Sequence, residues 1–350
     1  MMRRRVWLAV AQTLLGVGLL AAWLWIIDLE AVAKTLQQAR WGYVLFAAVL
    51  GMASSIVRAV RWRLVLKPIA PVPRLDVWLI GLASSLINFV IPIRSGEIAR
   101  SFFLKQRDSV PISASLPTVA VDRSFDMLAM LTIGAVGILA GLRIQASLTV
   151  VFVLAGGLFL GFAIFVTLAI FWQKRLLRAA EWAVPRFIGE NLRTRMLGIL
   201  SGILIGFTAI GRQPRSLVPL ITISFAAALL DAGLFFLLFL SVGNPVPPLV
   251  ALTGYALFAI TFLVPGGPGY IGSMEAFGSL VFGGALGVPQ AAAASVILIF
   301  HALTALILGI FGGIAIWALG FRPSSAFRSV VDAQSVAGIP SSGPQPSAEG

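Results

Sequence analysis

Long apolar segments are the feature that most constrains this chain. Five stretches approach or exceed the roughly 20 residues that a helix needs to cross a bilayer: Val6–Ile27, Trp41–Val57, Val150–Trp172, Leu217–Leu240 and Ala291–Leu319. Only 11% of the 350 residues are charged, whereas soluble domains carry about 25%. A soluble fold could not bury this much apolar surface. The sequence therefore predicts an all-α polytopic membrane protein.

The basic residues indicate an orientation for these spans. The net charge is +13, and Lys and Arg lie in short loops, where positive charge marks the cytoplasmic side. Arg3, Arg4 and Arg5 place the N-terminus there, before a first span too long for a secretory signal. We expect a bacterial inner membrane protein with both termini in the cytoplasm. Anionic lipid headgroups suit such loops, whereas nucleic acid does not, because no soluble domain presents a basic face.

Proline and glycine interrupt two further apolar segments. The first segment, Val77–Ile93, breaks near Asn88–Gly96, where Pro92 removes a backbone donor. The second breaks at Pro265–Gly269. Backbone groups freed at membrane depth must be satisfied by protein or by a water-filled cavity. Paired breaks in the two halves of a chain are typical of a transporter binding site.

The flanks of the breaks predict how each segment enters the membrane. Basic residues lie on both sides of the first segment, which favours a re-entrant hairpin from the cytoplasm, while the second lacks them and is expected to enter from outside. We therefore predict about six full transmembrane helices plus two re-entrant hairpins, in an inverted-repeat arrangement. The spans are Val6–Ile27, Trp41–Val60, Pro117–Ala140, Leu148–Phe171, Leu217–Leu240 and Ala291–Leu319. Residues 1–320 would form one transmembrane domain, with Arg195–Ile210 at the interface, and residues 321–350 a disordered cytoplasmic tail.

Charged residues follow the first break directly. Arg94, Glu97 and Arg100 lie there, and Glu97 and Arg100 are spaced to pair on a helix. The planar fork of arginine suits phosphate, so these residues either line a site for an anionic headgroup or only fix the topology. Asn88 either satisfies freed backbone or contacts the substrate.

A second cluster lies within one predicted span. A charge at the bilayer centre costs about 2.5–3.5 kcal/mol, so Asp122, Arg123 and Asp126 need partners. Arg123 can reach Asp126 one turn away. The cluster either faces a cavity, where it binds substrate or carries a proton, or clamps helices together. Asp231 lies in the middle of another span and is either a functional carboxylate or a hydrogen-bonded packing residue.

The second break has its own candidates. Glu275 begins the half-helix after it and is a proton site, a first-turn carboxylate favoured by the helix dipole, or a partner of a buried arginine. Gly267 belongs to a glycine-rich turn whose N–H groups could hold an anion. His301, the only histidine, is expected to be a packed, hydrogen-bonded residue, with a proton relay as the alternative. One histidine and no cysteine predict no metal or other cofactor.

Four motifs in order resemble one known family. They are Arg58-Ala-Val-Arg61-Trp62-Arg63, which by itself suggests an interfacial anchor; Asn88…Pro92…Gly96-Glu97…Arg100; Asp122-Arg123…Asp126; and Pro265-Gly-Gly267…Gly269…Glu275 with Gly287-Val288. Together, from about Trp41 to Leu319, they resemble the lysylphosphatidylglycerol synthase transmembrane-region family, also called the flippase-like domain family.

The resemblance implies a polytopic protein that moves, or helps to move, a lipid between leaflets. By position, the family's residues fall on Asn88, Pro92, Gly96, Glu97, Arg100, Arg123, Asp126, Gly267 and Glu275. The chain departs from the family at Asp122, where glutamate is common, and at His301, where many members have arginine. The second departure weakens an anion-binding role for the last span.

The sequence therefore predicts a flippase-like lipid transporter, not an enzyme. Arg94, Arg100 and Arg123 would neutralise the phosphate of an anionic, polyprenyl or hopanoid-type lipid, while Glu97, Asp126, Asp231 and Glu275 would balance charge or take protons. Two alternatives are a membrane enzyme acting on a lipid-linked substrate and a non-transporting scaffold of an envelope-lipid pathway. Proton coupling and a homo-oligomer are both left open.

Overall fold

The described part of the molecule is helical throughout. The computed structural model describes residues 2–91, 95–140, 214–262 and 267–321, with scattered residues between 157 and 204. Every regular element in these ranges is a helix or a helical turn, which confirms the predicted all-α class for this part of the chain. The predicted span Leu148–Phe171, the segment Arg195–Ile210 and the tail beyond residue 321 lie largely or wholly outside the described residues.

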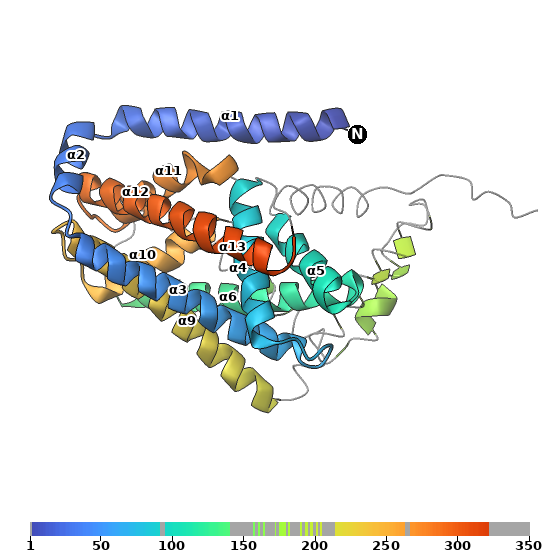
Figure 1. Ribbon diagram of the computed structural model, residues 1–350. Coiled ribbons are helices and arrows are strands. Elements are labelled where there is room, and N and C mark those ends of the chain that lie inside the picture. The colour runs from blue at the N-terminus through green and yellow to red at the C-terminus, as the bar shows by residue number, and fades with distance from the viewer. Residues whose placement is uncertain are drawn as a thin grey trace, which may run out of the picture.

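Long helices occupy the other five predicted spans (Figure 1). They are α1 (Met2–Ile26), α3 (Trp41–Leu66), α6 (Ile112–Leu139), α9 (Pro214–Ser241) and α12 (Gln290–Ile307), which a π-helical turn (Leu308–Gly312) joins to α13 (Gly313–Ala318). Three are long and apolar enough to cross a membrane, over Trp41–Leu66, Leu217–Ser241 and Gln290–Ala318. A bent pair, α1 and the short α2 (Leu29–Gln37), makes up to four. The chain is thus a multi-pass membrane protein, and the count of six spans stays a prediction.

One helix starts earlier than its sequence suggests. The prediction began a span at Pro117, but α6 starts at Ile112 and contains this proline. Pro111 is the residue directly before the helix, with φ −58° and ψ 139°, so the helix starts after this proline and not at Pro117. Pro117 removes only one backbone hydrogen bond, close to the N-terminal end of α6, and is tolerated there.

The first broken segment is a helical hairpin. Helix α4 (Arg74–Val90) ends at Ile91, and α5 (Ser95–Asp108) packs back against it. A Cβ on Gly96 would lie 2.5 Å from both the Ser84 carbonyl oxygen and the Asn88 Cβ. Glycine at this position therefore allows the two helices to touch. The predicted break thus falls between two helices that pack together, whereas the re-entrant hairpin stays a prediction; Pro92 lies outside the described residues.

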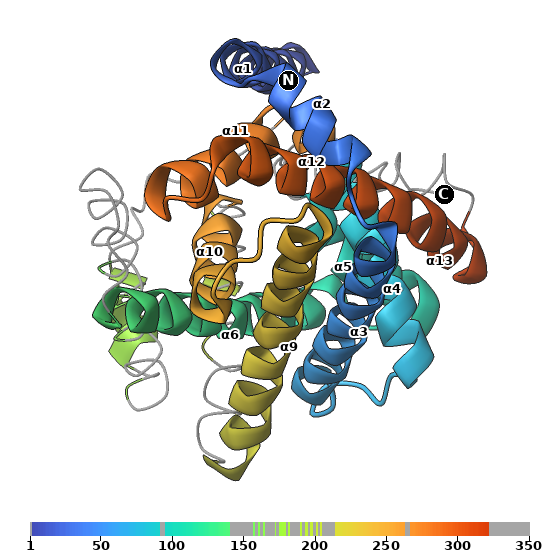
Figure 2. The same ribbon diagram turned by 90° about the vertical axis from the view of Figure 1, so that its left-hand side faces the viewer.

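The second broken segment lies beneath α1. Helix α10 (Pro248–Thr261) ends at the break, and the chain continues through a 3₁₀ turn (Pro268–Tyr270) into α11 (Ser273–Ser279) and a π-helical turn (Leu280–Ala285). A Cβ on Gly272, whose φ is +80°, would lie 1.9 Å from the Gly16 carbonyl oxygen of α1. Figures 1 and 2 both show α1 lying across this region, and α2 descending from its end.

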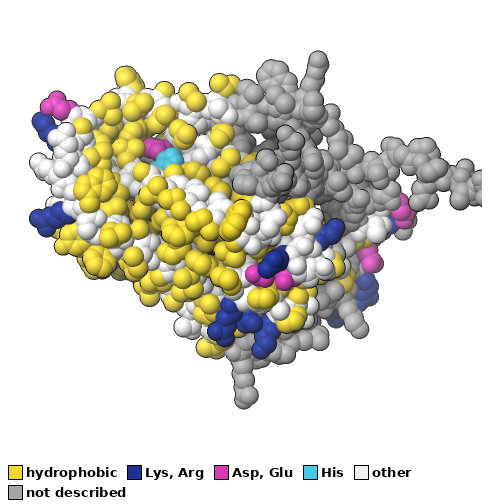
Figure 3. All heavy atoms as spheres, viewed as in Figure 1, with side chains coloured by type: hydrophobic (Ala, Val, Ile, Leu, Met, Phe, Trp, Pro, Cys, Tyr) yellow, Lys and Arg dark blue, Asp and Glu magenta, His cyan; other side chains and the backbone are white. Residues whose placement is uncertain are grey.

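The two largest apolar cores of the described residues flank a polar centre. Helices α3 and α9 run side by side, and α10 packs on α6 and α9 (Figure 2). On α3, Ala47 belongs to one core and Trp62 to the other, and Arg58 and Arg61 come between them. The outer surface is mostly apolar in the view of Figure 3, as expected for a protein solvated by lipid.

Candidate functional site

A cavity of about 330 Å³ lies where the two broken segments meet. One part of its wall is polar and comes from α3, the first hairpin and α6: Arg58, Ser84, Ser85, Asn88, Glu97, Arg100, Arg123 and Asp126. Another part is apolar or aromatic and comes from α4, α6, the segment from α10 to α11, and α12 with the turn after it: Phe89, Met127, Met130, Ile260, Phe262, Tyr270, Met274, Phe300 and Leu308. A cavity with both kinds of wall suits an amphipathic ligand.

A hydrogen bond joins the two breaks directly. The Asn88 side-chain amide at the end of α4 donates to the Tyr270 hydroxyl across 3.0 Å. The Phe89 ring lies 6.3 Å from that of Tyr270 and 5.8 Å, edge-on, from His301. Asn88 therefore connects the first broken segment to the second through a side-chain contact. The expectation that it satisfies freed backbone gains no support, because its Oδ1 makes no hydrogen bond among the described residues.

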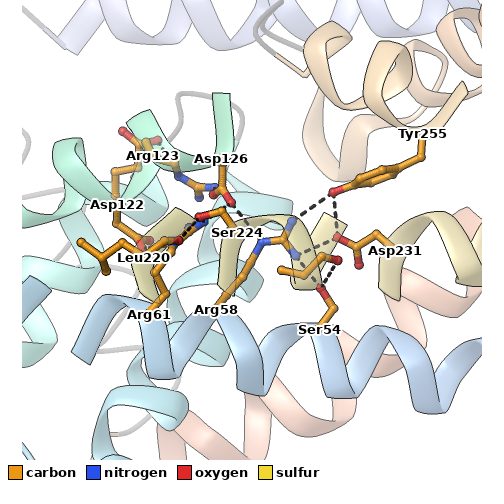
Figure 4. A network of polar contacts seen from close by, with 12 residues as sticks. Ser54, Arg58, Arg61, Asp122, Arg123, Asp126, Leu220, Ser224, Asp231 and Tyr255 are labelled. Atoms are coloured by element: carbon orange, nitrogen blue, oxygen red, sulfur yellow. Dashed lines mark hydrogen bonds and ion pairs between the residues drawn. The ribbon is translucent and has the colours of Figure 1, made fainter. Parts of the chain in front are cut away.

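A buried ion-pair network forms one end of the cavity (Figure 4). Arg61 Nε donates to Asp122 Oδ1 across 2.7 Å, and its Nη1 lies 2.8 Å from Asp126 Oδ1. The Arg61 side chain is 0% exposed. The prediction that this arginine anchors α3 at the membrane interface is therefore wrong.

Arg58, one turn before Arg61, also lies near Asp126, with Nε 3.5 Å from Oδ1, but extends toward Tyr255 and Asp231 in Figure 4. It donates to Asp231 Oδ2 across 2.7 Å and to the Tyr255 hydroxyl across 3.0 Å. Tyr255 also donates to Asp231. Asp231 Oδ2 thus accepts two hydrogen bonds, as one of the two predicted roles requires, and Asp231 also lines a second hollow of about 200 Å³. Arg58 and Arg100 line both spaces.

The pairing around the first break differs from the expected one. Glu97 lies 3.3 Å from Arg123 of α6, and Arg100 donates to Asp122 across 3.1 Å. The expected pair between Glu97 and Arg100 is therefore wrong: α5 packs on α6, so each residue meets a partner there. The predicted contact between Arg123 and Asp126 is confirmed, at 3.4 Å.

The network contains equal numbers of positive and negative charges, but its ion pairs differ in their exposure to solvent. Four arginines face four carboxylates in the described residues: Arg58, Arg61, Arg100 and Arg123 against Glu97, Asp122, Asp126 and Asp231. Arg61 and Asp122 are almost fully buried, and breaking such a pair costs about 3–5 kcal/mol. The side chains of Arg123 and Glu97 are 42% and 37% exposed, and such pairs contribute about 0–1 kcal/mol. The buried pair of Arg61 and Asp122, the inner pair, is therefore fixed. The exposed pair of Arg123 and Glu97, the outer pair, can exchange partners.

The second break holds another polar pair. Glu275 lies in the first turn of α11, as predicted, and its Oε2 accepts from the Gly272 N–H across 2.7 Å. Its Oε1 contacts His301 Nδ1, and His301 Nε2 lies 2.8 Å from the Gly269 carbonyl oxygen. His301 is thus the packed, hydrogen-bonded residue that was expected. Neither residue lines the cavity.

Two further candidates do not join the site. Gly267 is buried where α1 crosses the break, since a Cβ on Gly16 would lie 3.4 Å from its Cα; a role in anion binding stays a prediction. Arg94 lies outside the described residues. Reasoning from sequence missed the site roles of Arg58, Arg61 and Tyr255, although the i, i+3 spacing of the two arginines already placed them on neighbouring turns of one helix.

The fold and this site define a multi-pass helical membrane protein with a charged internal cavity between two broken helical segments. The chain belongs to the family described as "Lysylphosphatidylglycerol synthase TM region", whose family model matches residues 8–312. This confirms the resemblance found in its motifs.

Individual relatives are distant. A UPF0104 membrane protein of Pyrococcus horikoshii is 26% identical over 87% of this chain and 95% of its own length. Glycosyltransferase AglD of Haloferax volcanii is 25% identical over 84% of this chain, which spans only 51% of that relative. No solved structure matches the chain.

Proposed function

We propose that this protein moves an anionic lipid between membrane leaflets by admitting its headgroup to the cavity between the two broken segments. The observation that carries the proposal is the half-exposed pair of Arg123 and Glu97 in the wall of that cavity. A phosphate can replace the Glu97 carboxylate on Arg123 at little cost, because the exposed pair is weak. The planar guanidinium group then binds the phosphate by two hydrogen bonds.

The rest of the site supports this exchange. The buried contacts of Arg61 with Asp122 and Asp126 hold α3 against α6, so the cavity keeps its shape when the outer pair opens. The aromatic and methionine wall accommodates the apolar part of the ligand next to its phosphate. A space of about 330 Å³ holds a headgroup while the chains stay in lipid. The second hollow beyond Arg58 and Arg100 offers a continuation of the same path.

The experiment is lipid translocation in proteoliposomes containing a fluorescent anionic phospholipid. Arg123→Gln should lower the translocation rate by about tenfold or more, because the loss of a charge-assisted hydrogen bond is worth about 1.5–3 kcal/mol. Arg107→Gln is the matched control: Arg107 is exposed on α5 and pairs with Asp76, away from the cavity. Equal rates for wild type and Arg123→Gln would refute the proposal. A wild-type rate no higher than that of liposomes without protein would also refute it and would favour a scaffold that transports nothing.

The proposal also includes the membrane in which the protein lies and its oligomeric state. We infer an inner membrane with both termini in the cytoplasm from the positive charge of the loops. A homo-oligomer would not alter the argument, because the cavity walls come from one chain. Proton coupling would act through carboxylates near the cavity, of which Glu97 is the most exposed.

The name of one relative supports a second candidate, an enzyme acting on a lipid-linked sugar. That relative is a glycosyltransferase, but this chain spans about half of its length. The described residues contain no group of three or more carboxylates or histidines placed to hold a metal ion. Sugar transfer to a lipid phosphate by the purified protein, measured with and without divalent metal, would establish this alternative.

A further inference from the structure

Glu275 and His301 tie the second break to the last span. The imidazole of His301 on α12 is engaged at both nitrogens, by the Glu275 carboxylate at Nδ1 and by the Gly269 carbonyl at Nε2. The Gly272 N–H binds the other oxygen of Glu275. These contacts fix the segment from Gly269 to Glu275 onto α12, and the same segment contributes Tyr270 and Met274 to the cavity wall.

The geometry requires a proton between the two side chains. A backbone carbonyl only accepts, so Nε2 must carry a hydrogen and donate it to Gly269. The lone pair of Nδ1 would then face a lone pair of the Glu275 carboxylate and repel it, unless one further proton lies between them. That proton sits either on Nδ1, giving an imidazolium and a carboxylate, or on Oε1, giving an imidazole and a carboxylic acid. Both forms have no net charge.

Among the described residues, no other charged side chain contacts the pair. Apart from Glu275 and His301, α1 from residue 13 onward, α10, α11 and α12 contain no charged residue. Of the other helices packed on α12, α2 carries Glu30 and Lys34, which pair with each other at the surface, and α3 and α9 carry Arg58 and Asp231, which also pair with each other. The charged residues of α4, Arg74 and Asp76, lie at its far end, and the neighbouring titratable group is the phenol of Tyr270. Loss of the shared proton would therefore leave an isolated negative charge among apolar residues, which is costly.

We propose that Glu275 and His301 form a proton-binding site whose occupancy holds the segment from Gly269 to Glu275 closed against α12. The closed state needs the proton, whereas an opened and hydrated state does not. Binding of the proton and closure must therefore favour each other equally. The site is closed at low pH and opens as the pH rises and the proton is lost. Figure 3 shows the histidine beside a carboxylate at the outer surface, and the His301 side chain is 13% exposed, so the pair is not sealed inside the fold.

The absence of cysteine makes the opening measurable. In Met274→Cys the new thiol replaces a side chain that is 3% exposed, next to Glu275. Its alkylation by a water-soluble maleimide, with the protein in lipid nanodiscs, reports opening across a range of pH. Each rate is divided by that of Ser109→Cys, an exposed position, to correct for ionisation of the thiol.

Two substitutions in the Met274→Cys background separate the effect of the shared proton from that of the hydrogen bonds between Glu275 and His301. In Glu275→Gln, the amide N–H donates to Nδ1 and the amide oxygen accepts from Gly272, so every contact is kept without a proton to lose. His301→Leu removes the connection. Gel filtration of each variant confirms that it is folded.

The three proteins should give three different pH profiles. With both residues intact, the corrected rate should be low at low pH and then rise by up to about tenfold per pH unit, the limit for one proton. Glu275→Gln should be slow and independent of pH, and His301→Leu fast and independent of pH. A profile of Glu275→Gln that rises as the wild-type pair does, or a His301→Leu rate as slow as wild type, would overturn the inference. The assay measures no transport, so it holds or fails separately from the headgroup proposal.

Discussion

The inner and outer ion pairs should differ sharply in their contribution to stability. Asp122→Asn keeps the shape of a side chain that is 2% exposed but removes the charge that Arg61 and Arg100 both face. Arg61 has no access to water and would keep only Asp126 as a charged partner. Breaking a buried pair costs about 3–5 kcal/mol. Because asparagine still accepts one hydrogen bond, we expect about 3 kcal/mol, a factor of roughly 150 in the unfolding equilibrium.

The matched variant is Glu97→Gln, which removes the same charge from the exposed outer pair. Its cost should be below about 1 kcal/mol. Both are measured by reversible unfolding in mixed micelles of mild detergent and dodecyl sulfate, followed by tryptophan fluorescence, since Trp62 lies against Arg100. Equal losses for the two variants, or a loss below about 1 kcal/mol for Asp122→Asn, would refute the division of the network into fixed and exchangeable pairs.

Two contacts between helices give further predictions for the same unfolding assay. Gly96→Ala should cost about 1–3 kcal/mol, because the new methyl group meets the Ser84 carbonyl at 2.5 Å, whereas Gly81→Ala, with no atom within 4 Å, should be neutral or slightly stabilising; similar losses for both would contradict the close packing of α4 on α5. Trp23→Phe removes the buried hydrogen bond of 2.8 Å from α1 to Ser279 and should cost about 1–3 kcal/mol; an unchanged stability would show that α1 is not held there.

Local features of the chain were predictable because they depend on neighbours in sequence. Hydropathy predicts the long helices, and Pro and Gly predict both breaks, since these residues act on the backbone at their own positions. The pair of Arg123 with Asp126 follows from helix geometry alone. The first-turn position of Glu275 follows in the same way from the break before it.

The choice among possible ion-pair partners was not predictable from the sequence. Glu97 has Arg100 within reach on its own helix but pairs with Arg123 on α6. Arg58 and Arg61 look from sequence like anchors at the end of a span, yet they meet carboxylates 61 to 173 residues away. The choice depends on which helices pack together and how far each pair is withdrawn from water, and neither quantity is a property of a short segment.

The sequence by itself determined that this chain enters a membrane, that two of its apolar segments are broken, and which charged residues must find partners there, because the cost of exposing apolar or charged groups to the wrong solvent is local and large. Only the tertiary structure decided that the two breaks meet through Asn88 and Tyr270, that the arginines of α3 lie inside, and that Glu275 binds His301. Those contacts join residues distant in sequence, and each forms only once the helices have packed.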